Sequence, residues 1–132
     1  MNFNSLVPEL SVSNIVKARY FYINILKFKL EYERQEDKFI FLSYGNAQIM
    51  FEEIQETGWN TAKFEYPLGR GINFQIDTDE VCEIKLRLEK ADIPLFKDIT
   101  VNRYCNGDEI YTEMELLVQD PDGYLLRFSQ VI

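Results

Sequence analysis

The apolar positions near the start of the chain change their period, and the change predicts a strand followed by a helix. Residues 5–12 mix apolar and polar side chains around Pro8, which is typical of an irregular or edge strand. From 14 to about 26 the apolar residues recur at spacings of three and four, the pattern of an amphipathic helix, and Ser13 or Asn14 can cap it. The buried stripe of this helix consists of Ile15, Ala18, Tyr22 and Ile25.

Three strands are predicted next, because the pattern returns to alternation of apolar and polar residues. They cover residues 27–34, 38–44 and 47–53. The pair Gly45-Asn46 between the last two supplies a tight hairpin turn. Residues 54–68 contain Gly58 and Pro67 with little periodicity, and we interpret them as a linker.

The pattern then restarts and predicts a second strand, helix and three strands. A strand over 72–76 leads to Thr78 or Asp79, either of which can cap the helix. The helical stripe consists of Val81, Ile84, Leu88 and Ala91, each 66 residues after a member of the first stripe. Three further strands are predicted near 95–104, 111–119 and 124–131.

This constant offset indicates an internal duplication. Leu10 and Val12 match Phe74 and Ile76 at an offset of 64 before the helices, and matching positions after the helices are 65 apart. The chain is therefore interpreted as one domain of two modules, about 1–53 and 69–132, joined by the linker.

The turn between the last two strands is specified by its residues. Asp120 can accept hydrogen bonds from the backbone, Pro121 presets one dihedral angle, and Gly123 accepts the left-handed conformation. The turn therefore needs no functional explanation, which leaves Arg127 in the following apolar strand as the unusual residue.

Charge and composition narrow the function. The 22 acidic and 14 basic residues give a net charge of -8, which argues against nucleic acid and fits a small cationic ligand better. No run of apolar residues is long enough for a membrane span and no signal peptide is evident, so we expect a cytoplasmic protein without a membrane partner. Cys82 and Cys105 form no CxxC motif and are expected to be buried or inert thiols.

Three segments resemble the vicinal oxygen chelate superfamily. They are PELSVSNIVKARYFYINILKFKL near the start, PLGRGINFQID in the middle and QDPDGYLLRF at the end. The superfamily includes glyoxalase I, extradiol dioxygenases, fosfomycin-resistance enzymes and bleomycin-resistance proteins, and GRGINFQ most resembles the bleomycin-resistance branch. The resemblance implies an α+β fold in which two βαβββ modules form a curved mixed sheet around the ligand. It also implies a homodimer.

In metal-using members of this superfamily, four ligands lie on the first, fourth, fifth and eighth strands. By motif alignment the four positions here are Val7, Met50, Gly71 and Arg127. None of these side chains suits a divalent metal, and the chain has no histidine. We therefore predict no metal and no other cofactor, while Glu52 near Met50 keeps a shifted alignment open.

Strand parity then predicts which side chains face the ligand, because residues alternate between the two faces of a sheet. The neighbours Ile49, Phe51, Phe74 and Leu126 would form the apolar face beneath the helices. The candidate ligand-binding residues are Glu9, Phe39, Phe41, Met50, Glu52, Trp59, Asn73, Gln75, Glu113, Glu115 and Arg127. Purely structural interpretations stay open: the phenylalanines as sheet packing, Trp59 as cover for an apolar edge, the glutamates as a solvated face, and Arg127 as an ion-pair partner.

Two functions are compared on this basis. The favoured one is metal-independent binding and sequestration of a small cationic or amphipathic molecule, as the resemblance to bleomycin-resistance proteins implies. It needs acidic groups for attraction, aromatic rings for stacking and no catalytic residue. The alternative is a glyoxalase- or dioxygenase-like enzyme with a non-standard or absent metal site, in which Glu52 or Glu113 could act as a general base.

Overall fold

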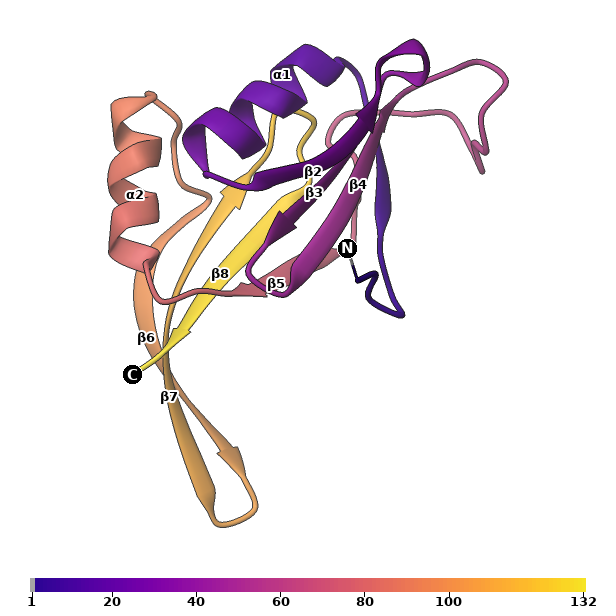
Figure 1. Cartoon of the computed structure of the whole chain (residues 1–132). Helices are drawn as coiled ribbons and strands as arrows, with labels where there is room; N and C mark the ends of the chain where they lie inside the picture. Colours follow the sequence, from indigo (N-terminus) through magenta and orange to yellow (C-terminus); the bar gives the residue numbers. More distant parts are fainter. Residues whose placement is uncertain (1) are drawn as a thin grey trace. The chain divides into compact units, whose positions relative to one another are not determined.

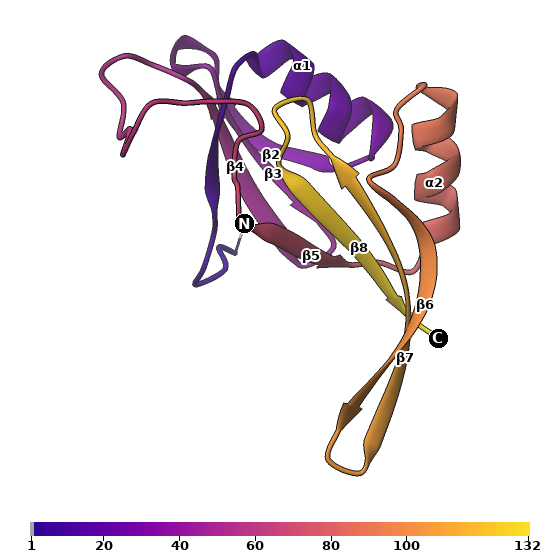
Figure 2. The same cartoon turned by 180° about the vertical axis from the view of Figure 1, so that it is seen from behind.

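The computed structural model describes residues 2–132, which divide into two compact units, one up to Leu68 and one from Gly69 onward. Each unit contains a strand, a helical segment and three further strands, as Figures 1 and 2 show. Each unit has its own sheet and its own apolar core.

The first unit is a four-stranded mixed sheet with the strand order β1-β4-β3-β2. Its first strand runs parallel to β4, and the other neighbours are antiparallel. The elements are β1 (Glu9–Val12), α1 (Ile15–Arg19), the π-helix η1 (Tyr20–Ile25), β2 (Lys29–Arg34), the 3-10 helix η2 (Gln35–Asp37), β3 (Phe39–Tyr44) and β4 (Ala47–Glu53).

The predicted helix over residues 14–26 is present but changes its hydrogen bonding midway from α to π. Asn14 caps it, because its Oδ1 accepts hydrogen bonds from the backbone N–H groups of Val16 and Lys17. The predicted stripe turns inward, with Ile15 the more exposed member and Ala18, Tyr22 and Ile25 buried. The core beneath it is completed by Leu10, Val12, Phe21, Leu26, Ile40, Leu42 and Phe51.

The second unit repeats this topology with the strand order β5-β8-β7-β6. Its first strand is again parallel to its last, and the remaining pairs are antiparallel. The elements are β5 (Asn73–Asp77), α2 (Val81–Lys90), β6 (Lys97–Asn106), β7 (Glu109–Gln119) and β8 (Leu125–Val131). The core consists of Ile76, Val81, Ile84, Leu88, Leu116, Val118, Leu126 and Phe128.

The two sheets together make the chain an α+β protein, as the sequence predicts. The matching strand orders agree with the internal duplication inferred from the offsets. The predicted turn after β7 is also confirmed, since Asp120 Oδ1 accepts from the N–H groups of Asp122 and Tyr124, and Gly123 has φ +93°.

Several local predictions are wrong. The first strand begins only at Glu9, because Pro8 has no N–H for the ladder and residues 5–8 stay irregular. Neither Thr78 nor Asp79 is the N-cap of α2; Glu80 occupies that position, and Gln130 Oε1 accepts the Val81 N–H instead.

The expected burial of the two cysteines is also wrong, since both are exposed free thiols. Cys82 follows the buried Val81 on α2 and so falls on the outer side of the helix. Cys105 lies near the end of β6, which forms the edge of its sheet beside β7 among the described strands. Whether a cysteine is buried depends on the face of the helix or strand on which it lies. The residue type alone does not show which face that is.

One glycine is required by packing as well as by its backbone. Gly69 has φ +72°, and a Cβ atom there would overlap Cδ1 of Tyr124 and lie 2.8 Å from Cε1 of the same ring. Gly71 has φ +85°, yet a Cβ atom at that position would meet nothing within 4 Å. Both glycines therefore have a left-handed backbone, but only Gly69 lies against a neighbouring side chain that leaves no space for a Cβ atom.

Replacing Gly69 by alanine should lower the free energy of unfolding by roughly 2–4 kcal/mol, the sum of a left-handed alanine and an overpacked ring. The matched variant Gly71→Ala should lose only about 1 kcal/mol, since its backbone is strained without a clash. Urea titration followed by circular dichroism measures both. Equal losses in the two variants would show that the contact with Tyr124 does not constrain Gly69.

Candidate functional site

The first unit contains a cavity of about 430 Å³ beside the end of its sheet. Three predicted residues meet here, two carboxylates from neighbouring strands and the single tryptophan of the chain. The lining consists of Glu9, Ser11, Arg34, Glu52, Glu53, Gln55, Gly58, Trp59 and Asn60.

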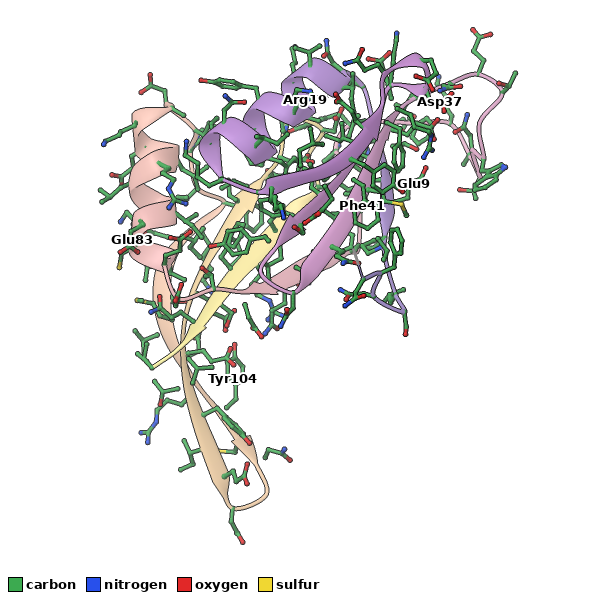
Figure 3. The ribbon with its side chains drawn as sticks, viewed as in Figure 1. Glu9, Arg19, Asp37, Phe41, Glu83 and Tyr104 are labelled. Carbon is green, nitrogen blue, oxygen red and sulfur yellow. The ribbon has the colours of Figure 1, made fainter. Side chains whose placement is uncertain are left out.

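The parallel pairing of β1 with β4 brings the two carboxylates together. Glu9 is opposite Met50 and Ser11 is opposite Glu52, so Glu9 and Glu52 lie diagonally across adjacent strands on one face. The intervening residues Leu10 and Phe51 point into the core on the other face. The alternation predicted from the sequence therefore places both acids on the face that bears the cavity, and Figure 3 shows Glu9 beside the sheet.

Glu52 contributes to a shift in the pKa of Glu9. Loss of water around the Glu9 carboxyl raises its pKa, and a hydrogen bond to Glu52 and the negative charge of Glu52 raise it further. The positive charge of Arg34 acts in the opposite direction. Glu52 also accepts a hydrogen bond of 3.1 Å from Gln55 Nε2. A cation placed between the two carboxylates would therefore reduce the repulsion that acts on Glu9.

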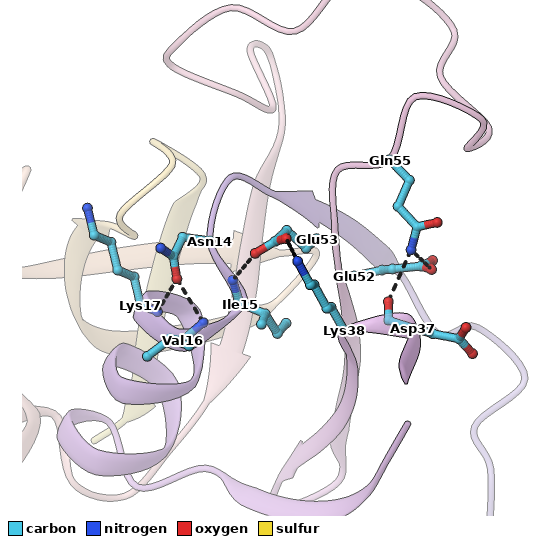
Figure 4. Close-up of polar contacts among 9 residues, drawn as sticks. All are labelled: Asn14, Ile15, Val16, Lys17, Asp37, Lys38, Glu52, Glu53 and Gln55. Carbon is cyan, nitrogen blue, oxygen red and sulfur yellow. Dashed lines mark hydrogen bonds and ion pairs between the residues drawn. The ribbon is translucent and has the colours of Figure 1, made fainter. Parts of the chain in front are cut away.

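The neighbouring Glu53 has the opposite environment. Its carboxylate accepts a hydrogen bond of 2.8 Å from Lys38 Nζ and another of 3.2 Å from the Ile15 N–H, as Figure 4 shows. The bond from Lys38, followed by that from Ile15, lowers the pKa of Glu53. Glu53 thus ties the start of α1 to the end of β4, and its charge is already compensated.

The only cation lining this cavity among the described residues is also engaged. Arg34 Nε donates a hydrogen bond of 2.9 Å to Asp37 Oδ2, and its guanidinium lies 3.9 Å above the ring of Phe39. Gln55 Nε2 donates a hydrogen bond to the backbone carbonyl of Asp37 and so links the segment after β4 to η2 (Figure 4). The negative charge of Glu9 and Glu52 is therefore only partly balanced.

The predicted aromatic residues differ in accessibility. Phe39 and Phe41 share the face of Glu9 and Met50 but are 2% and 1% exposed. Tyr32 stacks on Phe41 with ring centroids 5.2 Å apart, and Phe3 meets the same ring edge-on. Trp59 is 99% exposed at the cavity. Of the three predicted rings, the indole is thus the one presented to a ligand.

A separate polar cluster lies on the corresponding face of the second unit. Glu115, only 3% exposed, accepts a hydrogen bond of 2.5 Å from the Tyr104 hydroxyl and pairs with Arg127 at 3.6 Å. Arg127 Nη2 also donates to Gln75 Oε1 at 2.8 Å. The hydrogen bond to Glu115 raises the pKa of Tyr104. Arg127 is therefore an ion-pair partner, which is one of the structural roles left open by the sequence.

The other two residues predicted in this unit lie near the cluster. Glu113 accepts a hydrogen bond of 2.8 Å from the Ser129 hydroxyl, which is buried. Asn73 is exposed at the start of β5 and lies opposite Leu125. The cluster contains two carboxylates and one guanidinium, so its charges are partly compensated.

The four positions that the motif alignment matches to metal ligands carry side chains that do not suit a divalent metal. Val7 has no donor atom, Met50 offers a soft thioether, Gly71 has no side chain, and the Arg127 guanidinium is a donor already bonded to Gln75. Within residues 2–132 no group of three or more histidine, cysteine, aspartate or glutamate residues is arranged to hold a metal. These four residues can therefore contact a ligand or contribute a positive charge, but they do not form a ligand set for a divalent metal.

Sequence reasoning did not select several lining residues. Arg34, Gln55 and Asn60 lie in the cavity wall, and Tyr104 belongs to the second cluster. A bulge in β2 between Leu30 and Tyr32 shifts the side-chain alternation, so simple parity could not place Arg34. Gln55 and Asn60 lie in the segment without periodic pattern, where the sequence carries no signal of their position.

A scan against models of protein families found no match, and a search of curated proteins also found none. Solved structures do match. One of them is a member of the glyoxalase/bleomycin resistance protein/dioxygenase superfamily from Vibrio splendidus. It is 31% identical to this chain, and the match covers 94% of this chain and 95% of the other, with a TM-score of 0.44.

Two other solved structures superpose better. A glyoxalase/bleomycin resistance protein/dioxygenase from Alicyclobacillus acidocaldarius is 19% identical, covers 98% of this chain and 92% of its own, and has a TM-score of 0.66. A lactoylglutathione lyase from Agrobacterium tumefaciens is 19% identical, covers 98% and 96%, and has a TM-score of 0.63. The chain therefore has the glyoxalase/bleomycin resistance fold. Within the described residues, no helix has the length and apolar character needed to cross a membrane.

The pKa shifts of Glu9 and Glu53 have opposite directions, so they predict opposite effects of pH on the free energy of unfolding. A raised pKa at Glu9 means that stability is lost as pH rises from the ordinary value of 4.5 through the raised value. A lowered pKa at Glu53 means that its contribution is present above 4.5 and is lost as pH falls through the lowered value.

Glu9→Gln should therefore raise the urea midpoint near neutral pH and have little effect below the ordinary glutamate pKa. Glu53→Gln, which removes the same charge from the neighbouring strand, should lower the midpoint near neutral pH. Urea titrations of both variants across acidic and neutral pH measure this difference. A destabilised Glu9→Gln protein near neutral pH would contradict the proposed repulsion between Glu9 and Glu52.

Proposed function

We propose that the protein binds and sequesters a small cationic or amphipathic molecule without a metal, in the manner of bleomycin-resistance proteins. The observation that supports this most directly is the cavity of about 430 Å³ in the first unit, which combines two interacting carboxylates with an exposed indole. A cavity of this size lies within the range of pockets that hold small organic ligands.

The charge of the cavity favours a cation. Glu53 and Arg34 already have close partners of opposite charge, whereas Glu9 and Glu52 lie against each other. A cation placed between the last two would replace their repulsion with attraction on both sides. The overall charge of -8 adds long-range attraction, which is screened by salt.

The indole favours a ligand with a flat or apolar part. Trp59 is almost fully exposed at the cavity, and its face is available for stacking or for a cation–π contact. On the sheet face that bears the cavity, Tyr32 packs against the buried rings of Phe39 and Phe41, and Phe3 packs against Phe41. This arrangement supports recognition by contact and charge, and it requires no reacting group.

A second candidate is a metal-free enzyme of the same superfamily, and the raised pKa of Glu9 favours it. A carboxyl with a raised pKa in a cavity is a candidate for accepting or donating a proton. Such an enzyme would convert a bound substrate, whereas a sequestering protein returns its ligand unchanged. Turnover therefore separates the two candidates.

Calorimetric titration with a cationic glycopeptide such as a bleomycin tests the proposal. We expect binding that weakens with added salt, and we expect Glu9→Gln, Glu52→Gln and Trp59→Ala each to weaken it by roughly ten-fold or more, as loss of a charge or ring contact does. The matched control is Glu36→Gln, which makes the same change in net charge at an exposed residue of η2 outside the cavity wall.

The control variant should bind within about two-fold of the unmodified protein, because long-range attraction is screened. Equal weakening in Glu36→Gln and Glu9→Gln would show that overall charge alone attracts the ligand. Absence of heat with the glycopeptide, together with turnover of a thiol adduct or a catechol, would overturn sequestration and favour the enzyme.

A further inference from the structure

The turn that carries Trp59 is built on the backbone of Gln55. Residues 55–60 are defined here as the indole turn. The backbone carbonyl of Gln55 accepts hydrogen bonds from the Gly58 N–H at 3.1 Å and from Asn60 Nδ2 at 2.9 Å. The Asn60 N–H donates to the Gly58 carbonyl at 2.9 Å, so Trp59 is the central residue of a three-residue turn. The backbone at Trp59 is therefore tied to that of Gln55.

The side chain of Gln55 attaches the indole turn to two other elements. A primary amide carries two N–H donors on one nitrogen. Gln55 Nε2 lies 3.1 Å from the backbone carbonyl of Asp37 at the end of η2 and 3.1 Å from Glu52 Oε1 on β4 (Figure 4). Both partners are acceptors, so the amide oxygen could not replace the nitrogen here. One side chain thus links the turn to β4 and to η2.

The Trp59 side chain has little else to fix its position. It is 99% exposed, so packing against neighbouring side chains contributes almost nothing. Its place in the cavity wall beside Glu9 and Glu52 therefore depends on the backbone of the indole turn. The hydrogen bonds of Gln55 are exposed to water, so each contributes modestly, but all of them act on this one short segment.

We propose that Gln55 is a positioning residue for ligand binding, which holds the indole turn in place so that Trp59 lies beside Glu9 and Glu52. The effect on affinity rests on the proposed function. A mobile turn would have to be ordered when a ligand binds, and this ordering costs conformational entropy. Because Gln55 orders the turn in advance, it reduces that cost. Its hydrogen bond also orients the Glu52 carboxylate.

Nuclear magnetic resonance tests the positioning without any ligand, through the order parameter of the Trp59 backbone amide. We expect a value of about 0.85 in the unmodified chain, as in rigid backbone, and below about 0.6 in Gln55→Glu and Gln55→Leu. The glutamate has nearly the same shape as glutamine, but its oxygens face two acceptors and repel them. Circular dichroism confirms that each variant is folded.

The matched control is Gln35→Glu, which makes the same charge change at an exposed glutamine of η2 outside the wall of this cavity. It should leave the order parameter of Trp59 unchanged. An equally high order parameter in both folded Gln55 variants would overturn the proposal, since the turn would then be held without this side chain. So would a low value in the unmodified chain.

Calorimetric titration with a bleomycin separates positioning from charge, because the two predict opposite effects of Gln55→Glu. An added carboxylate alone should strengthen binding of a cation, whereas a mobile indole should weaken it. We expect Gln55→Glu and Gln55→Leu to weaken binding by about three- to ten-fold and Gln35→Glu to remain within about two-fold. Unchanged or tighter binding by Gln55→Glu would overturn the proposed role in binding.

The two measurements also distinguish this inference from the proposed function. If the unmodified chain gives no heat with the glycopeptide, sequestration of that ligand fails, and a role of Gln55 in binding it fails as well. The order parameters then still decide whether Gln55 positions Trp59. If the unmodified chain binds but the Gln55 variants bind equally well, sequestration stands and the positioning role is wrong.

Discussion

Parallel hydrogen bonding between the first and last strands of each unit determines the rest of this structure. Parallel strands cannot be joined by a tight turn, so the chain must cross one face of the sheet before it returns. The crossing helices cover that face, α1 in one unit and α2 in the other. Side chains that alternate away from the helices lie on the opposite face, which bears the cavity in the first unit.

This constraint explains why much of the fold could be predicted from the sequence. Side chains of a strand such as β4 point alternately to the two faces of the sheet, so Ile49 and Phe51 share one face and are buried beneath the helix. The helices follow the same argument through their stripes, and the turn at Asp120 follows from residue chemistry alone. Each of these features depends on residues close together in the chain, where pattern and geometry are directly related.

The candidate site could be predicted only in part, because it combines strand positions with irregular segments. Alternation placed Glu9 and Glu52 on one face, but it could not show that Phe39 and Phe41 would be covered by Tyr32 and Phe3. That cover depends on a bulge and on a segment before the first strand. Hydrogen bonds such as that between Tyr104 and Glu115 depend on rotamers, which the sequence pattern does not encode.

The repeated topology has a consequence for the polar side chains that the chain presents. Each unit has its own sheet and its own set of buried apolar residues. The sheet faces that carry the polar side chains differ between the units, with an acidic cavity and an indole in the first and a cluster around Arg127 in the second. A chain with a repeated topology can thus present two different sets of polar side chains on the same arrangement of strands.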